Sequence, residues 1–283
     1  MIQSCVTISL VPQAKGGPFV FWGDLAGSCA KAAELGFDAV EIFAPSAEDL
    51  DARLLQQILA QGRLKLGAMG TGAGWVLRKL RLTDPDVATR TRAVEFISAI
   101  IDFAGSFGAP TIIGSMQGRF ENDVTREQAI GWLREALDKL GSRAGAFGVP
   151  LLFEPLNRFE TNLVNTVEDG LELVQSLTTK NVKLLCDVFH MNIEERSISA
   201  ALRLGGKQVG HLHFVDSNRR PAGDGHVDFR AVAQALTDIG YSGYASAEAL
   251  PIPDSESAAR QTMSSFRKFF PGDLVSSAAT VSG

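Results

Sequence analysis

NVKLLCDVFH, at residues 181–190, is one of four short apolar runs in the second half of the chain, each with a potential metal ligand at or just beyond its end. The runs and their residues are VPLLFEP with Glu154, NVKLLCDVFH with Asp187, VGHLHFVD with His213, and GYASAEAL with Glu248. These residues are 33, 26 and 35 positions apart. A strand and a helix of a (β/α)₈ barrel together span roughly 30 residues, and functional side chains lie at the carboxyl ends of the strands. The spacing therefore predicts a barrel in which the four residues meet at its mouth.

The rest of the chain divides into alternating strands and helices. Continuous apolar runs between turn residues are typical of strands buried on both faces of a parallel sheet. We expect strands at 5–10, 38–43, 64–69, 110–114, 151–153, 183–187, 209–214 and 243–248. Helices are indicated at 24–35, 84–107, 125–147, from 166, and at 195–204, 229–239 and 254–270, with Asp84, Thr125 and Thr166 as expected N-caps. The alternation predicts an α/β fold, a single (β/α)₈ TIM barrel.

Composition is consistent with one soluble enzyme domain. The chain has 283 residues, of which 45% are hydrophobic and 21% charged, so it can bury a large core. We expect the TIM barrel to span 1–271 and a small, polar, flexible C-terminal tail to span 272–283. The net charge of -5 argues against a nucleic-acid partner, because such proteins usually carry a basic patch.

The sequence also indicates a cytoplasmic protein. Its three cysteines form no paired motif, which argues against disulfides and a thiolate zinc site. The first segment has no Lys or Arg before Lys15, unlike the basic start of a secretory signal, and is expected to form the first strand. No apolar run approaches the roughly 18 residues of a membrane span, so no membrane partner is expected.

Four segments carry a family resemblance: FEPLNRFETNLVNT, CDVFHMNIEE, GHLHFVDSNRRPAGDGHVDF and GYASAEAL. Together they resemble the xylose isomerase-like TIM barrels of the sugar isomerase/epimerase superfamily, and most closely the ketose 3-epimerases of D-tagatose or D-psicose type. The segments cover strands five to eight, whereas the first half of the chain matches mainly in architecture.

The resemblance implies epimerisation of a ketose at C3, a proton transfer through an enediolate. It implies that Glu154 and Glu248 are metal ligands and also the acid/base pair on opposite faces of the sugar, whereas Asp187 and His213 are ligands only. Three carboxylates and one imidazole suit Mn²⁺, Mg²⁺ or Co²⁺, and we expect one divalent metal, with Mn²⁺ as the first choice.

The resemblance also implies a substrate-binding set, Glu160, His190 and Arg219, in loops after the strands. A distal pocket is expected from earlier loops, around Trp75, Ser115, Gln117 and Arg119. His211 shares a strand face with His213 and is expected to support it. The glycines of AMGTGAGW lack the lysine of a phosphate loop and are expected to form a flexible loop at the mouth.

Other functions are compatible with the same residues. An aldose-ketose isomerase of hydroxypyruvate isomerase type or a dehydratase of dehydroshikimate type would use a similar metal site. An endonuclease IV-like protein would need more than the four histidines present and a basic groove. A barrel that only binds sugar has no need of a carboxylate on each face of it. The resemblance further implies a homo-oligomer, a dimer or a tetramer, with a small-molecule sugar as substrate.

Overall fold

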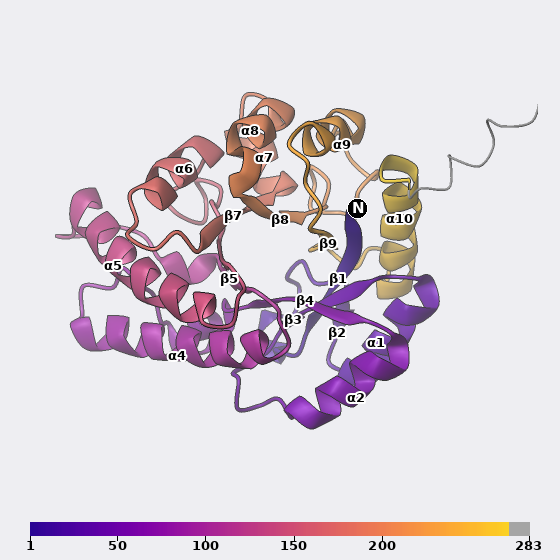
Figure 1. The fold of residues 1–283 in the computed structure, drawn as a ribbon, viewed down its shortest axis with the longest axis horizontal. Coiled ribbons are helices and arrows are strands. Elements are labelled where there is room, and N and C mark those ends of the chain that lie inside the picture. Colours follow the sequence, from indigo (N-terminus) through magenta and orange to yellow (C-terminus); the bar gives the residue numbers. More distant parts are fainter. Residues whose placement is uncertain (272–283) are drawn as a thin grey trace, which may run out of the picture.

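A closed barrel of eight parallel strands forms the centre of the molecule, as predicted (Figure 1). In the computed structural model, which describes residues 1–271, the strands pair in chain order and β1 pairs with β9 to close the barrel. The barrel strands are β1 (Gln3–Ser9), β3 (Ala39–Phe43), β4 (Lys65–Gly70), β5 (Thr111–Ile113), β6 (Leu151–Phe153), β7 (Val182–Asp187), β8 (Val209–His213) and β9 (Tyr244–Ala247). A further short strand, β2 (Phe21–Trp22), pairs with the end of β1. The predicted tail at 272–283 lies outside the described residues.

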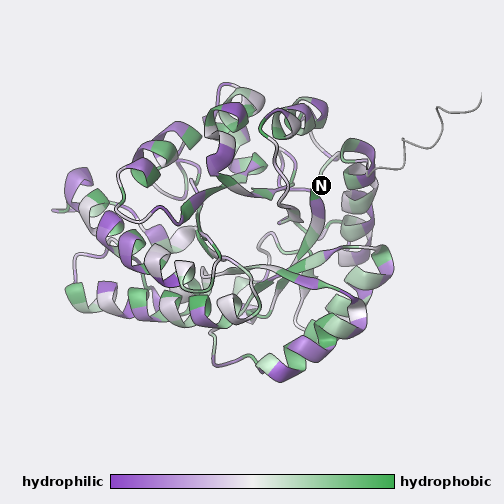
Figure 2. Cartoon of the chain, in the orientation of Figure 1, coloured by the Kyte–Doolittle hydropathy of each residue, from purple (hydrophilic) through white to green (hydrophobic). Residues whose placement is uncertain are grey.

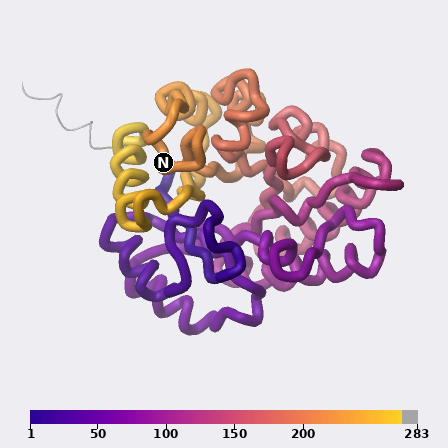
Figure 3. Tube along the Cα trace, turned by 180° about the vertical axis from the view of Figure 1, so that it is seen from behind, coloured from indigo at the N-terminus to yellow at the C-terminus, as the bar shows by residue number. Residues whose placement is uncertain are grey.

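Helices surround the barrel on its outer side, as both the front and the reverse views show (Figures 1 and 3). They are α1 (Leu25–Leu35), α2 (Ala52–Gly62), α3 (Ala73–Arg78), α4 (Val87–Ser106), α5 (Arg126–Gly145), α6 (Val167–Gln175), α7 (Val188–Glu194), α8 (Ile198–Gly205), α9 (Phe229–Asp238) and α10 (Ser255–Phe269). Hydrophobic and hydrophilic residues alternate along them (Figure 2), as expected of amphipathic helices that cover a core. None of the described helices is both long and apolar enough to cross a membrane.

Most helix starts follow the predicted capping residues. The side chains of Thr125 and Thr166 each take part in a capping box at the start of α5 and α6. The long helix α4 is an exception, because its N-cap is Asp86 and not Asp84. Asp84 instead accepts hydrogen bonds from the Asp86 amide and from Arg81. These two bonds fix the end of the loop that precedes α4. The predicted helix at 195–204 is also corrected, since α8 begins only at Ile198 and the separate helix α7 precedes it.

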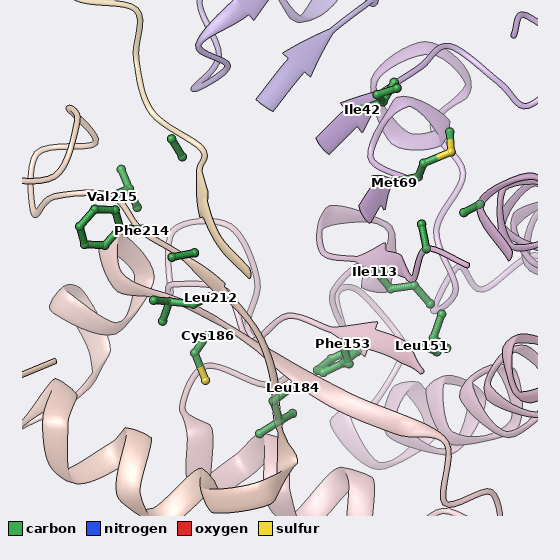
Figure 4. Packing of buried hydrophobic residues seen from close by; sticks show 14 of the residues in the cluster. Ile42, Met69, Ile113, Leu151, Phe153, Leu184, Cys186, Leu212, Phe214 and Val215 are labelled. Atoms are coloured by element: carbon green, nitrogen blue, oxygen red, sulfur yellow. The ribbon is translucent and has the colours of Figure 1, made fainter. Parts of the chain in front are cut away.

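Alternation along the strands sorts side chains between two cores. Phe153, Cys186 and Leu212 belong to the large core between the barrel and the helices (Figure 4). The neighbouring Leu152 and Leu185 belong to the small core inside the barrel. Because successive side chains of a strand point to opposite faces, the residues two positions after Leu152 and Leu185 also face inward. Those residues are two of the predicted metal ligands.

Candidate metal centre

The four predicted metal ligands lie together at the carboxyl end of the barrel. Glu154 and Glu248 directly follow β6 and β9, and Asp187 and His213 are the last residues of β7 and β8. One ligand atom from each of the four lies within 4.8 Å of all the others. Asp187 and His213 are 1% exposed and Glu154 is 6% exposed, so this cluster is largely shielded from solvent.

His213 presents one ring nitrogen to all three carboxylates. Its Nδ1 atom is 3.0 Å from Oδ2 of Asp187, 3.5 Å from Oε1 of Glu154 and 3.4 Å from Oε2 of Glu248. Burial opposes the charged imidazolium, but the charges of Glu248 and Glu41 and the hydrogen bond with Asp187 raise the pKa of His213 well above its usual value. Nδ1 is therefore the atom with which His213 would bind a cation.

Two carboxyl groups in the cluster have opposite pKa shifts. Burial raises the pKa of Glu154 to about 8, against the attraction of the His213 ring 3.5 Å away. Burial also disfavours ionisation of Asp187, but the charge of Arg219 and the hydrogen bond with His213 hold its pKa well below the usual range. In the absence of a cation, Glu154 therefore holds a proton more readily than Asp187. Paired carboxyl groups with separated pKa values are typical of acid/base sites.

The donor atoms of the cluster fit a divalent cation. Oε1 of Glu154 is buried and has no hydrogen-bond donor among the described residues, an arrangement that is costly for an acceptor unless a cation lies beside it. Three carboxylates and one imidazole are a mixed oxygen and nitrogen set, which suits Mn²⁺, Mg²⁺ or Co²⁺. The cysteines Cys5, Cys29 and Cys186 are buried and belong to neither group of potential metal ligands in the described chain.

Arg219, predicted to bind substrate, contacts two of the cluster carboxylates. Its Nη1 donates a hydrogen bond of 2.8 Å to Oδ2 of Asp187, and its Nη2 donates to Oε2 of Glu248. The guanidinium lies over the ring of Phe189, with 4.7 Å between Cζ and the ring centroid. The structure therefore places a fixed positive charge at the edge of the cluster and on the wall of the pocket.

His190 and Glu160 line the same pocket. The backbone amide and the side-chain amide of Asn157 lie 3.3 and 2.7 Å from Nδ1 of His190, so this nitrogen is an acceptor. The ring proton therefore lies on Nε2, which is 3.9 Å from Oε1 of Glu154. Burial lowers the pKa of His190 to about 4, and the ring is neutral at neutral pH. Oε1 of Glu160 accepts a hydrogen bond of 3.2 Å from Asn157.

Glu41, which the sequence analysis missed, joins His211 and His213 inside the barrel. Its carboxylate is 4% exposed, with Oε2 3.0 Å from Nε2 of His211 and Oε1 3.3 Å from Nε2 of His213. His211 was expected to support His213, and the structure places both rings against Glu41. The available signal was a single acidic residue within the apolar strand AVEIF.

A cavity of about 670 Å³ opens above the cluster. Trp75, Ser115 and Arg119 of the expected distal set line this cavity, whereas Gln117 does not. Gln117 is fully buried, and its side-chain amide donates a hydrogen bond of 2.9 Å to the backbone oxygen of Glu154. Gln117 therefore holds the strand end that carries a cluster residue and does not face the pocket.

The glycine-rich segment AMGTGAGW contains the end of β4, a turn of two residues and the start of α3, where a longer loop was predicted. Strand β4 ends at Gly70 and α3 begins at Ala73. A Cβ atom on Gly72 would lie 2.9 Å from Cε2 of Phe43, and one on Gly74 would lie 2.6 Å from Sδ of Met116. These glycines therefore permit close packing of α3 at the barrel mouth.

Comparisons with known proteins agree with this architecture. A family model described as xylose isomerase-like TIM barrel matches residues 29–269. The D-psicose 3-epimerase of Ruminiclostridium cellulolyticum is 34% identical over 220 residues, which cover 75% of this chain and 74% of that protein. The D-psicose 3-epimerase of Agrobacterium fabrum is 31% identical over 234 residues, covering 81% of this chain and 78% of that protein. A solved structure of an L-ribulose 3-epimerase superposes with a TM-score of 0.78 at 26% identity, covering 95% of this chain and 94% of that one.

Proposed function

The chain belongs to the xylose isomerase-like TIM barrel family, among the relatives of the ketose 3-epimerases, and we propose that it catalyses metal-dependent epimerisation of a ketose at C3. The observation that carries the proposal is the cluster at the barrel mouth. Two glutamates from β6 and β9, Glu154 and Glu248, share it with Asp187 and His213, and ligand atoms of all four lie within 4.8 Å of one another.

The cluster residues would hold one divalent cation, with Mn²⁺ as our first choice. Bound there, the cation would supply positive charge that favours loss of the proton beside the ketose carbonyl. Asp187 and His213 serve in the proposal as ligands only. Arg219 adds a second positive charge through its contacts with Asp187 and Glu248.

The two glutamates would move the proton. One carboxylate takes the proton from C3 on one face of the sugar, and the other carboxyl returns a proton to the opposite face, which inverts the centre. The position of Glu154 supports this exchange, because its carboxyl group lies in the cluster and on the wall of the pocket that would hold the sugar.

Pocket residues would orient the sugar. His190 presents an Nε2–H donor toward Glu154, and Glu160 and Arg219 lie beside it on the pocket wall. We propose that these three bind oxygens near C1 to C3, while Trp75, Ser115 and Arg119 face the distal end of the sugar. The cytoplasmic location and the assembly into a dimer or tetramer remain predictions.

Exchange of substrate hydrogen with deuterated solvent tests the proposal. Free fructose, tagatose, psicose, ribulose and xylulose are incubated with Mn²⁺ or with EDTA and followed by NMR. We expect deuterium at C3 together with a new epimer, both abolished by EDTA. Deuterium at C1 with formation of an aldose would favour the isomerase alternative, and no exchange with any of these sugars would contradict the proposal.

Turnover of variants at saturating Mn²⁺ tests the acid/base role of the two glutamates. Glu154→Gln and Glu248→Gln should each lower turnover by roughly 10²–10⁴-fold, the usual effect of losing a general acid or base. Glu135→Gln, on the exposed side of α5, is the matched control and should leave turnover unchanged. Turnover that survives either site variant would exclude that residue from proton transfer.

A further inference from the structure

We propose that Glu41 is a positioning residue that, together with His211, sets the orientation and the proton position of His213. This inference rests on the metal site of the proposed function. Glu41 lies on β3, across the barrel from the strands that carry three of the four cluster residues. Its action would pass through His213, because the carboxylate of Glu41 is not one of the four proposed ligands.

The surroundings of Glu41 require charged or polar partners. On one side Glu41 pairs with the apolar Ala68 of β4, and on the other with Thr7 of β1, whose hydroxyl donates to the backbone oxygen of Ala247 and not to Glu41. A buried carboxylate is strongly destabilising unless hydrogen bonds or opposite charges compensate it. In the described chain the side-chain partners of Glu41 are the rings of His211 and His213. The two histidines of β8 are therefore the groups that offset the buried charge of Glu41.

The two nitrogens of His213 face different groups. Nδ1 points to the carboxylates of the cluster, 3.0 Å from Asp187, and Nε2 lies 3.3 Å from Oε1 of Glu41. A neutral imidazole carries a proton on only one nitrogen. With the proton on Nε2, Glu41 accepts it and the lone pair of Nδ1 is free for a cation. With the proton on Nδ1, two acceptors would face each other at Nε2. Asp187 favours a proton on Nδ1 in the same way, so Glu41 supports the metal-binding form of His213 once a cation takes the place of that proton.

His211 completes the arrangement by orienting Glu41. Its Nε2 is 3.0 Å from Oε2 of Glu41, which leaves Oε1 directed at His213. The two imidazole rings stand edge to face, with centroids 5.7 Å apart and an angle of 84° between their planes. One carboxylate thus hydrogen-bonds to His211 and lies in charge contact with Nε2 of His213, and rotation of Glu41 would break both contacts.

The same three side chains could alternatively bind a second cation, because one ligand atom from each lies within 4.8 Å of the others. A cation on Nε2 of His213 in addition to one on Nδ1 would require the ring to lose both protons. Only three ligands would be available, and Glu41, His211 and His213 are all at most 4% exposed. A single cation per chain, with Glu41 holding His213, needs no such deprotonation.

Calorimetric titration with Mn²⁺ tests the inference on the full-length protein. Glu41→Gln keeps the volume of the side chain but cannot accept from both histidines at once. We expect it to bind Mn²⁺ 10–100-fold more weakly than wild type, the usual effect of removing a group that orients a metal ligand. The Mn²⁺ affinity of His211→Gln should lie between those of Glu41→Gln and wild type, and the affinity of the control Glu135→Gln should equal that of wild type. The expected stoichiometry for wild type is one Mn²⁺ per chain.

Two further readouts distinguish positioning from general damage. Turnover by Glu41→Gln should recover as Mn²⁺ is raised, because the defect lies in metal affinity. The ¹⁵N chemical shifts of His213, measured with diamagnetic Mg²⁺, should show a protonated Nε2 in wild type and a different proton distribution in Glu41→Gln. If Glu41→Gln does not fold, His211→Gln provides the same measurements.

The outcomes separate this inference from the proposed function. Wild-type Mn²⁺ affinity in Glu41→Gln and in His211→Gln, or two Mn²⁺ per wild-type chain, would overturn the positioning role while leaving the epimerase proposal standing. Absence of Mn²⁺ binding by wild type would overturn the metal site itself. Weaker binding that excess Mn²⁺ does not rescue would indicate structural damage and also contradict the inference.

Discussion

Substitution of Gly114 by alanine should disturb the metal cluster without unfolding the barrel. Gly114 follows β5, and a Cβ atom there would lie 2.4 Å from Oε2 of Glu154. Carbon and oxygen atoms that are not bonded normally stay about 3.5 Å apart, so the Glu154 carboxylate must move by about 1 Å. The backbone of Gly114, with φ −108° and ψ −101°, lies outside the main α and β regions, so alanine there also carries backbone strain.

A movement of this size exceeds what metal binding tolerates, because ligand distances in such sites vary by only about 0.2 Å. We expect Gly114→Ala to bind Mn²⁺ at least tenfold more weakly than wild type. Turnover should fall by roughly 10²-fold, as is usual for a misplacement of about 1 Å at a reacting group. Global stability in EDTA should fall by about 1–3 kcal/mol, because the backbone strain outweighs the gain of about 0.4–1 kcal/mol from reduced freedom of the unfolded chain.

The assay compares Mn²⁺ titration, turnover and thermal melting for Gly114→Ala and for the control Gly131→Ala. A Cβ atom on Gly131, within α5, meets no atom within 4 Å, so the control should keep wild-type metal affinity. Full metal affinity and turnover in Gly114→Ala would show that Glu154 is not held where the structure has it. Loss of folding in Gly114→Ala would equally contradict the reasoning.

Three further predictions follow from the site and its packing. The pKa of Glu154, about 8, lies above its usual value of 4.5, and the pKa of His213 is also raised, so both groups must lose a proton when Mn²⁺ binds. Calorimetry should therefore show the Mn²⁺ affinity falling by roughly ten- to a hundredfold per pH unit from pH 8 to pH 6, and a flat profile would contradict this. A cation whose free concentration is 100 times its Kd stabilises a protein by about 2.7 kcal/mol. Removal of the cation by EDTA should therefore lower the Tm by about 5–10 °C, and an unchanged Tm would argue against tight binding. In Gly74→Ala the new Cβ would lie 2.6 Å from Sδ of Met116, so the free energy of unfolding in urea should fall by about 1–3 kcal/mol. In Gly131→Ala, where the new Cβ meets no atom, it should rise by about 0.5–1 kcal/mol. Equal changes in the two variants would contradict the packing argument.

Local signals were sufficient for most of the secondary structure. The capping pairs at Thr125 and Thr166 predicted the starts of α5 and α6, since a capping side chain acts on amides only three residues away. The start of α4 was misplaced because two aspartates close in sequence can both cap a helix. Only the hydrogen bonds of Asp84 to Arg81 and to the Asp86 amide show which one ends the loop.

Sequence by itself determined the barrel and the four cluster residues, because a strand and a helix repeat at a constant length and the carboxyl ends of parallel strands meet at one end of the barrel. The tertiary structure alone decided the contacts of Glu41, Gln117 and Arg219. Glu41 meets His211 across 170 positions of the chain, and Gln117 meets the backbone of Glu154 across 37. Such contacts depend on barrel closure and on the register between strands, and no periodicity within a single strand carries that information.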